Sequence, residues 1–137
     1  MPLIVVDVNF LAYLWVPGPL TATASMLLAE DPEWFAPPLW GSELHNVLLE
    51  HLRVGNGTLA AALGAMEGAE AQMGGSTVEV DSRSVLTLAA RSGCSTFVCE
   101  YAALALQLGT HLATADRKLA RAFPEMARLV SGRGQES

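Results

Sequence analysis

The amino-acid sequence predicts a three-layer α/β fold, in which a central, mostly parallel sheet carries helices on both faces. Short apolar runs rich in branched side chains alternate with longer segments of helical periodicity along residues 1–130. This alternation is typical of parallel strands that are joined by crossover helices. The first run, 3–6, is apolar at every position. A strand of that kind is expected to be buried on both faces of its sheet.

Composition indicates one domain. The chain has 137 residues, of which 51% are hydrophobic, and a formal net charge of −6. We expect a single domain over 1–130 and a disordered polar tail over 131–137. No apolar run is long enough to span a membrane, and the N-terminus lacks the basic segment of a signal peptide. These features predict a cytoplasmic protein without membrane contact, and the acidic charge argues against binding nucleic acid by bulk charge alone.

Prolines divide the first forty residues. A short helix is expected at 10–15, because Pro17-Gly18-Pro19 breaks the chain after it. A second helix runs to Glu30 and ends at Asp31-Pro32. A short strand is expected at 35–36, just before two further prolines.

Two helices are expected next, and glycines separate them. The helix at 40–53 has one apolar face, formed by Leu44, Val47, Leu48 and Leu52. Gly55-Asn56-Gly57 ends this helix, and Thr58 caps the following one, which reaches about residue 72. The second helix contains several Ala and Gly residues, so it is expected to pack closely against a neighbour.

The C-terminal half repeats the alternation. Residues 77–80 alternate in polarity and are expected to form an edge strand. Asp81 or Ser82 is expected to cap a helix at 85–91, which Gly93 closes. The remaining expected elements are an apolar helix at 96–108 that ends at Gly109, a strand at 111–114, a helix at 117–122 and a final strand at 127–130.

Two aspartates follow predicted strands. Asp7 comes directly after 3–6, and Asp116 follows 111–114. Parallel α/β sheets bind ligands beyond the carboxyl ends of their strands, so both positions are candidates for a site. Each aspartate taken alone also has a structural interpretation, as a turn former or a helix cap.

A third carboxylate lies near the start of a predicted helix. Glu43 is in the first turn of 40–53, where the helix dipole stabilises a negative charge by about 0.3–1 kcal/mol. Ser42 and Asn46 accompany it, and Glu43 and Asn46, three residues apart, are neighbours on one side of the helix. This polar patch indicates more than a helix cap.

Together Asp7, Glu43 and Asp116 predict an acidic metal site. Hard oxygen ligands without His or Cys suit Mg²⁺ or Mn²⁺ rather than zinc. Such an ion orients a phosphodiester, activates water and stabilises the leaving oxygen. The histidines have no metal-binding spacing, and the tryptophans lie near turns, so both sets are expected to be structural: His45, His51 and His111, and Trp15, Trp34 and Trp40.

The basic residues are concentrated near the C-terminus. Five of the eight Lys and Arg residues fall in one short stretch: Arg117, Lys118, Arg121, Arg128 and Arg133. A basic strip beside an acidic cleft is compatible with a phosphodiester substrate, and equally with solvated helix faces.

Three segments of the chain resemble the PIN-domain family, the fold of VapC toxins from toxin–antitoxin pairs. They are Ile4-Val5-Val6-Asp7-Val8-Asn9, Ser42-Glu43-Leu44-His45-Asn46-Val47-Leu48, and Leu104–Gly109 with Leu112-Ala113-Thr114-Ala115-Asp116-Arg117-Lys118-Leu119. The resemblance implies a metal-dependent ribonuclease with a four-acid site, a homodimer, and an antitoxin protein as partner. In this scheme Asp7, Glu43 and Asp116 hold Mg²⁺ or Mn²⁺ and carry catalysis, with five residues contacting substrate or supporting the ligands: Asn9, Ser42, Thr114, Arg117 and Lys118.

One position departs from the family pattern. The register back from Gly109 places Phe97 at the usual aromatic position and Val98 at the third acid. Valine cannot bind a metal ion. Glu100 is two residues further, about 200° around a helix, so it is expected to point away as an exposed or capping glutamate.

These observations leave three functional hypotheses. The first is an endoribonuclease that hydrolyses RNA phosphodiester bonds with metal-activated water. The second, suggested by Val98, is a degenerate PIN domain that binds RNA or a protein without cleaving. The third is a phosphatase of the haloacid dehalogenase type, which also opens with an Asp after a buried strand. Its second Asp would fall at Asn9, which disfavours it.

Overall fold

The strands of the protein form a single parallel sheet. A computed structural model describes residues 3–130. Within this range the sheet has four strands in the order β2-β1-β3-β4, and all neighbouring pairs are parallel. The strands are β1 (Leu3–Val6), β2 (Glu33–Phe35), β3 (Leu112–Thr114) and β4 (Ala127–Leu129). The two central strands, β1 and β3, are apolar and largely buried, as expected for strands covered on both faces.

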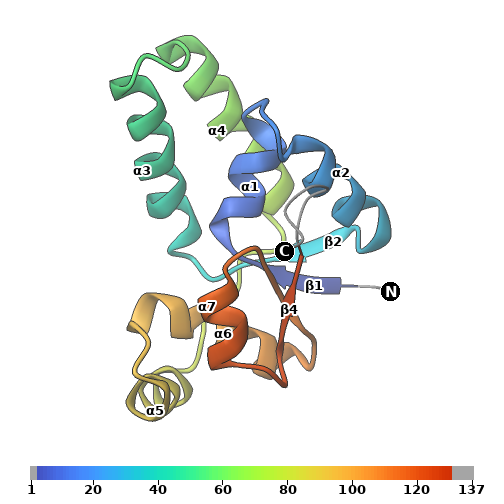
Figure 1. Cartoon of the computed structure of the whole chain (residues 1–137), viewed down its shortest axis with the longest axis vertical. Helices are drawn as coiled ribbons and strands as arrows, with labels where there is room; N and C mark the ends of the chain where they lie inside the picture. The colour runs from blue at the N-terminus through green and yellow to red at the C-terminus, as the bar shows by residue number, and fades with distance from the viewer. Residues whose placement is uncertain (1–2, 131–137) are drawn as a thin grey trace.

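Helices cover both faces of this sheet. Figure 1 shows α1 to α4 on one side of the strands and α5 and α6 on the other. The predicted three-layer α/β fold is therefore confirmed. The helices are α1 (Val8–Trp15), α2 (Thr21–Glu30), α3 (Trp40–Arg53), α4 (Leu59–Met73), α5 (Ser82–Ser92), α6 (Thr96–Leu108) and α7 (Arg117–Ala122).

The helix ends follow local sequence signals. Thr58 and Asp81 accept hydrogen bonds from backbone N–H groups in the first turns of α4 and α5, as predicted. Gly93 and Gly109 end α5 and α6 in the left-handed region, with φ of 75° and 67°. Helix α6 has the predicted bounds of 96–108, whereas α5 starts at Ser82 rather than at the predicted Val85.

The prediction of an edge strand at 77–80 is wrong. Only an isolated parallel bridge between Thr77 and Ala36 is present there. The side chain of Thr77 is engaged elsewhere, because its hydroxyl donates to the carbonyl of Met73 at 2.8 Å and accepts from the Trp40 indole at 2.9 Å. The segment therefore meets the end of β2 at one point and does not extend the sheet.

One hydrophobic core joins the sheet to its helices. Its largest fully buried side chains include Trp34, Phe10, Leu11, Leu44 and Leu104. None of the helices among residues 3–130 is both long and apolar enough to cross a membrane. The predicted polar tail, 131–137, lies outside the described residues.

A glycine allows α4 to approach α1 closely, as the small residues of this helix predicted. A Cβ atom built on Gly68 would lie less than 3.0 Å from the ring of Trp15. The ring cannot swing away freely, because its Nε1 donates a 2.7 Å hydrogen bond to Gln72, also on α4. Gly64, one turn earlier on α4, has no atom within 4 Å of the same position.

We expect Gly68→Ala to lower the free energy of unfolding by about 1–2 kcal/mol, because overpacking costs about 1–3 kcal/mol. That cost exceeds the gain of up to about 1 kcal/mol that Ala brings to a helix interior. Gly64→Ala is the matched control and should raise stability by about 0.5–1 kcal/mol. Urea unfolding measures both, and equal stabilisation by the two substitutions would contradict the close contact.

Candidate active site

The centre of the candidate site is a buried carboxylate. Asp7 follows β1 and is only 9% exposed. Its Oδ2 accepts a 2.6 Å hydrogen bond from the hydroxyl of Thr114, at the end of β3, and its Oδ1 accepts one of 2.9 Å from the backbone N–H of Asn9. The sequence prediction that the ends of these two strands meet is therefore confirmed.

Burial makes the charge of Asp7 costly. Removal from water raises the pKa of Asp7 to about 6, although the hydrogen bonds from Thr114 and Asn9 act in the opposite direction. The nearby charge of Asp116 raises it further. A carboxylate in this state is stabilised by any cation that reaches it.

Asp116 adjoins Asp7 through the same threonine. The Thr114 hydroxyl, which donates to Asp7, also accepts a 3.0 Å hydrogen bond from the backbone N–H of Asp116. One carboxylate oxygen of Asp116 accepts from the N–H groups of Lys118 and Leu119, so Asp116 caps α7. Asp116 therefore both caps a helix and lies beside Asp7.

Glu43 is held by a residue that sequence reasoning missed. The hydroxyl of Tyr101, on α6, donates a 2.6 Å hydrogen bond to Glu43 on α3. Partial burial raises the pKa of Glu43, the bond from Tyr101 lowers it, and the charge of Glu100 raises it. The available signal was a tyrosine within an apolar helix, since a buried Tyr hydroxyl usually finds a polar partner.

Tyr101 connects the two halves of the site. Burial and the bond to Glu43 raise the pKa of the Tyr101 hydroxyl far above its usual range. The charges of Glu43, Asp7 and Glu100 act in the same direction. This hydroxyl therefore lies within electrostatic reach of three carboxylates and remains a hydrogen-bond donor at any physiological pH.

The expectation for Glu100 is corrected by the structure. Ser95 caps α6, whereas Glu100 is partly buried and close enough to raise the pKa of Glu43. Glu100 thus lies within electrostatic reach of Glu43, which the hydrogen bond from Tyr101, the next residue on α6, holds near this end of the helix. Val98 is partly buried and packs against the hydrophobic core.

The donor chemistry of the site fits a hard divalent cation. Mg²⁺ in proteins is usually held by one or two carboxylates and retains several waters. Asp7 and Asp116 provide such a pair of neighbouring carboxylates, one of them buried and short of positive charge. Among residues 3–130, however, no three His, Cys, Asp or Glu side chains form a group that could hold a metal ion together. The three-carboxylate metal site therefore stays a prediction.

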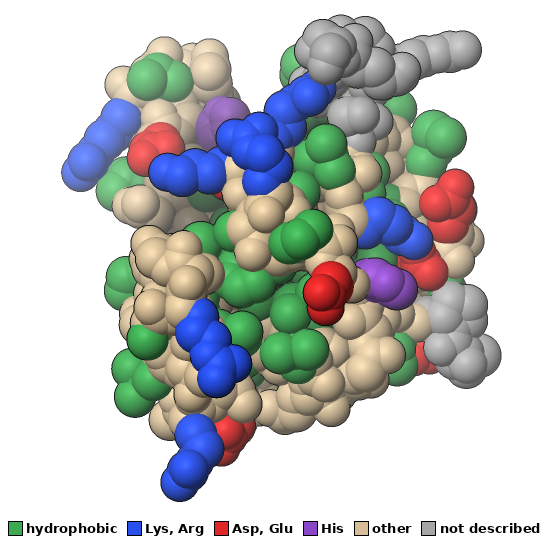
Figure 2. Space-filling view, turned by 60° about the horizontal axis from the view of Figure 1, so that its bottom comes forward, with side chains coloured by type: hydrophobic (Ala, Val, Ile, Leu, Met, Phe, Trp, Pro, Cys, Tyr) green, Lys and Arg blue, Asp and Glu red, His purple; other side chains and the backbone are tan. Residues whose placement is uncertain are grey.

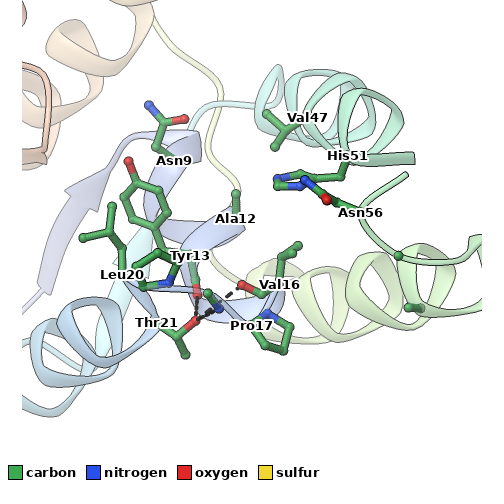
Figure 3. A pocket seen from close by; sticks show the side chains of 14 residues that line it. Asn9, Ala12, Tyr13, Val16, Pro17, Leu20, Thr21, Val47, His51 and Asn56 are labelled. Carbon is green, nitrogen blue, oxygen red and sulfur yellow. Dashed lines mark hydrogen bonds between the residues drawn. The ribbon is translucent and has the colours of Figure 1, made fainter. Parts of the chain in front are cut away.

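A large pocket begins at Asn9. This Asn9 pocket has a volume of about 700 Å³ and lies between α1 and the start of α4, with α3 along one side. Figure 3 shows Asn9 and Tyr13 on one wall and His51 and Asn56 on the other. Burial and the charge of Asp7 raise the pKa of Tyr13, so the pocket is electrostatically coupled to the acidic site.

A second pocket opens beside Glu43. This Phe97 pocket has a volume of about 530 Å³ and is lined from α3 by Ser42, Glu43, His45 and Asn46, and from α6 by Phe97. Ser42 is exposed here and contacts neither Asp7 nor Asp116 through a hydrogen bond among the described residues. The candidate site therefore has one pocket near Asp7 and another near Glu43.

The basic strip lies on the surface around α7. Arg117, Lys118 and Arg121 are exposed, while Arg128 forms a 2.9 Å ion pair with Asp31. Arg133 lies outside the described residues. Figure 2, which brings the lower side of Figure 1 forward, shows Lys and Arg side chains around a central area of hydrophobic side chains.

Comparison with solved structures identifies a similar fold. The crystal structure of PAE2754 from Pyrobaculum aerophilum matches 93% of this chain and 92% of its own, with 23% sequence identity and a TM-score of 0.73. Comparisons with models of protein families and with curated proteins give no match. The chain is thus an α/β protein whose fold is shared over nearly its whole length with a known structure, and at this identity the likeness concerns the fold alone.

The buried charge of Asp7 should be visible in the pH dependence of stability. Its pKa is about 6 in the folded protein and 3.8 when unperturbed, so the folded state holds a proton between these values that the unfolded state has lost. The contribution of Asp7 to stability is therefore present below about pH 4 and is lost as pH rises through 6. In the absence of divalent cations, Asp7→Asn should match the wild type near pH 4 and exceed it by about 1–3 kcal/mol at pH 7.

Chemical unfolding with EDTA at several pH values measures this difference. Asp81→Asn is the matched control, because Asp81 is an exposed helix cap and Asn retains the capping oxygen. A gain of equal size in Asp81→Asn, or none in Asp7→Asn, would rule out the burial of Asp7 as the cause.

The Tyr101–Glu43 hydrogen bond should contribute measurably to the free energy of unfolding and to the pKa of Glu43. Tyr101→Phe is expected to lower the free energy of unfolding by about 1–3 kcal/mol at neutral pH, since a buried bond to a charged group is lost. It should also raise the pKa of Glu43, because the bond from Tyr101 lowers that pKa. Carboxyl NMR of Glu43 and chemical unfolding measure the two effects. Tyr13→Phe is the control, since the Tyr13 hydroxyl has no hydrogen bond within residues 3–130, and similar effects there would contradict the assignment.

Proposed function

We propose that the protein is an Mg²⁺- or Mn²⁺-dependent endoribonuclease of the PIN-domain, VapC-like type. The observation that carries this proposal is the buried Asp7 carboxylate at the ends of β1 and β3, hydrogen-bonded to Thr114 and next to Asp116. Glu43 adds a third carboxylate, fixed by Tyr101. The order of the three PIN-like motifs along the chain supports the same conclusion.

One group of residues would hold the ion, and another would position the substrate. Asp7, Asp116 and Glu43 would hold the ion, which when bound polarises a phosphodiester and supplies an activated water. Thr114 fixes the orientation of Asp7, as Tyr101 fixes that of Glu43. Asn9 and Ser42 line the pockets on either side, and Arg117 and Lys118 are exposed near Asp116, where they would attract the RNA backbone.

The raised pKa values support the binding of a cation at this site. The pKa of Asp7 is raised to about 6 and that of Glu43 is raised as well, so both carboxylates are costly to charge without a cation beside them. Glu43 is only partly buried and lines the Phe97 pocket, so it is the proposed ligand that a substrate in that pocket would reach first.

The family resemblance supplies the cellular part of the proposal. A VapC-like toxin acts in the cytoplasm as a homodimer and is held inactive by an antitoxin protein. We include these features in the proposal on the strength of the three motifs quoted above.

A second candidate function is a PIN-like domain that binds RNA or a protein without cleaving. The specific observation in its favour is Val98, which packs against the core at the position where the family has its third acid. The two candidates share the fold and differ in one measurable activity.

Purified protein is expected to cleave single-stranded RNA with Mg²⁺ or Mn²⁺ and not with EDTA. Asp7→Asn and Glu43→Gln should each reduce the rate by about 100-fold or more, because each removes a charge that acts on the transition state. Asp81→Asn, at an exposed helix cap, is the matched control and should cleave like the wild type.

The same samples separate the two candidates. Mg²⁺ or Mn²⁺ should raise the melting temperature of the wild type and not that of Asp7→Asn, since an ion bound to the native state stabilises it. RNA binding without cleavage under either metal would exclude the nuclease and favour the binding function.

A further inference from the structure

Phe97 is the exposed aromatic side chain of this protein. All aromatic residues of the chain lie within residues 3–130, and the others are buried or partly buried. The tryptophans are structural, as predicted: Trp34 is in the core, and the indoles of Trp15 and Trp40 are hydrogen-bonded to Gln72 and Thr77. Phe97 is 61% exposed, so packing within the fold does not account for it.

The position of Phe97 relates it to the acidic site. Phe97 and Tyr101 are four residues apart on α6 and therefore lie on the same side of the helix, one turn from each other. Tyr101 holds Glu43, and Phe97 lines the pocket that opens at Glu43. The aromatic ring thus stands beside a carboxylate of the proposed catalytic set.

The lining of the Phe97 pocket fits a flat, uncharged, partly polar group. Apolar surface comes from Phe97, Leu39 and Leu49, and neutral hydrogen-bonding groups come from Ser42 and Asn46. Glu43 and His45 complete the lining, and none of these residues is Lys or Arg, so the negative charge of Glu43 disfavours a phosphate group inside the pocket. A volume of about 530 Å³ accommodates a single nucleobase with its sugar.

We propose that Phe97 is a stacking platform for a nucleobase of single-stranded RNA next to the scissile phosphate, with Ser42 and Asn46 at the edge of that base. The proposal deepens the proposed ribonuclease function and rests on it for the identity of the ligand. Stacking on an exposed aromatic side chain is a general way in which proteins hold single-stranded nucleic acid without strict sequence preference. The base occupies the pocket, and its phosphate lies toward the carboxylates.

The test uses a short single-stranded RNA that carries one 2-aminopurine, whose fluorescence is quenched when the base stacks. Titration is done in Ca²⁺, which takes the same oxygen ligands as Mg²⁺, and the RNA is checked to be intact afterwards. Phe97→Ala and Phe97→Leu are expected to abolish the quenching and weaken binding by about five- to a hundredfold, whereas Phe97→Tyr should retain both. Because Phe97 is exposed, these variants should fold normally, which their melting temperatures verify.

Leu106→Ala is the matched control. Leu106 is 55% exposed on the same helix and lies about two and a half turns further along, on the opposite side. It should bind and quench like the wild type. Equal binding by Phe97→Ala, equal binding by Phe97→Leu and Phe97→Tyr, or an absence of quenching in the wild type would each overturn the proposal.

The stacking site and the nuclease activity can fail separately. Loss of quenching in Phe97→Ala together with an absence of cleavage by the wild type would retain the stacking site and remove the proposed catalysis. If Phe97→Ala cleaves RNA like the wild type and still quenches the 2-aminopurine, the proposed catalysis is retained and the stacking site is excluded.

Discussion

The parallel pairing of β1 with β3 is the constraint on which the candidate site depends. Its register sets Val6 beside Ala113, so Asp7, which follows β1, and Thr114, the last residue of β3, meet at the same edge. The Thr114 hydroxyl then donates to Asp7 at 2.6 Å and accepts from the N–H of Asp116 at 3.0 Å. A slip of one residue would turn these side chains to the opposite face of the sheet. The sheet register therefore fixes both the position of the buried charge and the neighbours that make it tolerable.

The second link of the site crosses from α6 to α3. Without a cation, the charge of Asp116 repels that of Asp7 and the charge of Glu100 repels that of Glu43. Burial adds to the cost of charging Asp7 and Glu43. Among residues 3–130, the fold offsets this cost with hydroxyl donors rather than with Lys or Arg side chains: Thr114 donates to Asp7 and Tyr101 donates to Glu43. Neutral donors orient the carboxylates and leave their charge uncompensated. Such an arrangement favours the approach of a divalent cation more than an internal ion pair would.

Local signals made most of this structure predictable from sequence. Asp7 and Asp116 were placed correctly because strand ends and helix caps depend on a few adjacent residues. The Tyr101–Glu43 bond joins residues 58 positions apart, and no local pattern reports how α3 lies against α6. The influence of Glu100 on Glu43 could not be predicted for the same reason: the angle between Glu100 and Val98 is set by their own helix, whereas the distance from Glu43 depends on another. The exposure of Phe97 could not be predicted either, because the sequence of an apolar helix does not indicate which aromatic residue the neighbouring elements leave uncovered.

The first turns of α6 show why Val98 alone does not define the capacity of the site. At this position the side chain packs against the core and contributes no charge. The same helix nevertheless contributes three features within five residues: the exposed ring of Phe97, the charge of Glu100 and the hydroxyl of Tyr101, which fixes Glu43. In the proposed nuclease, this helix contributes no metal ligand at Val98 but still positions a carboxylate and presents a surface for a base. If binding of the ion depends mainly on Asp7 and Asp116, whose geometry the sheet fixes, then a valine at position 98 leaves in place both these ligands and the groups that orient substrate.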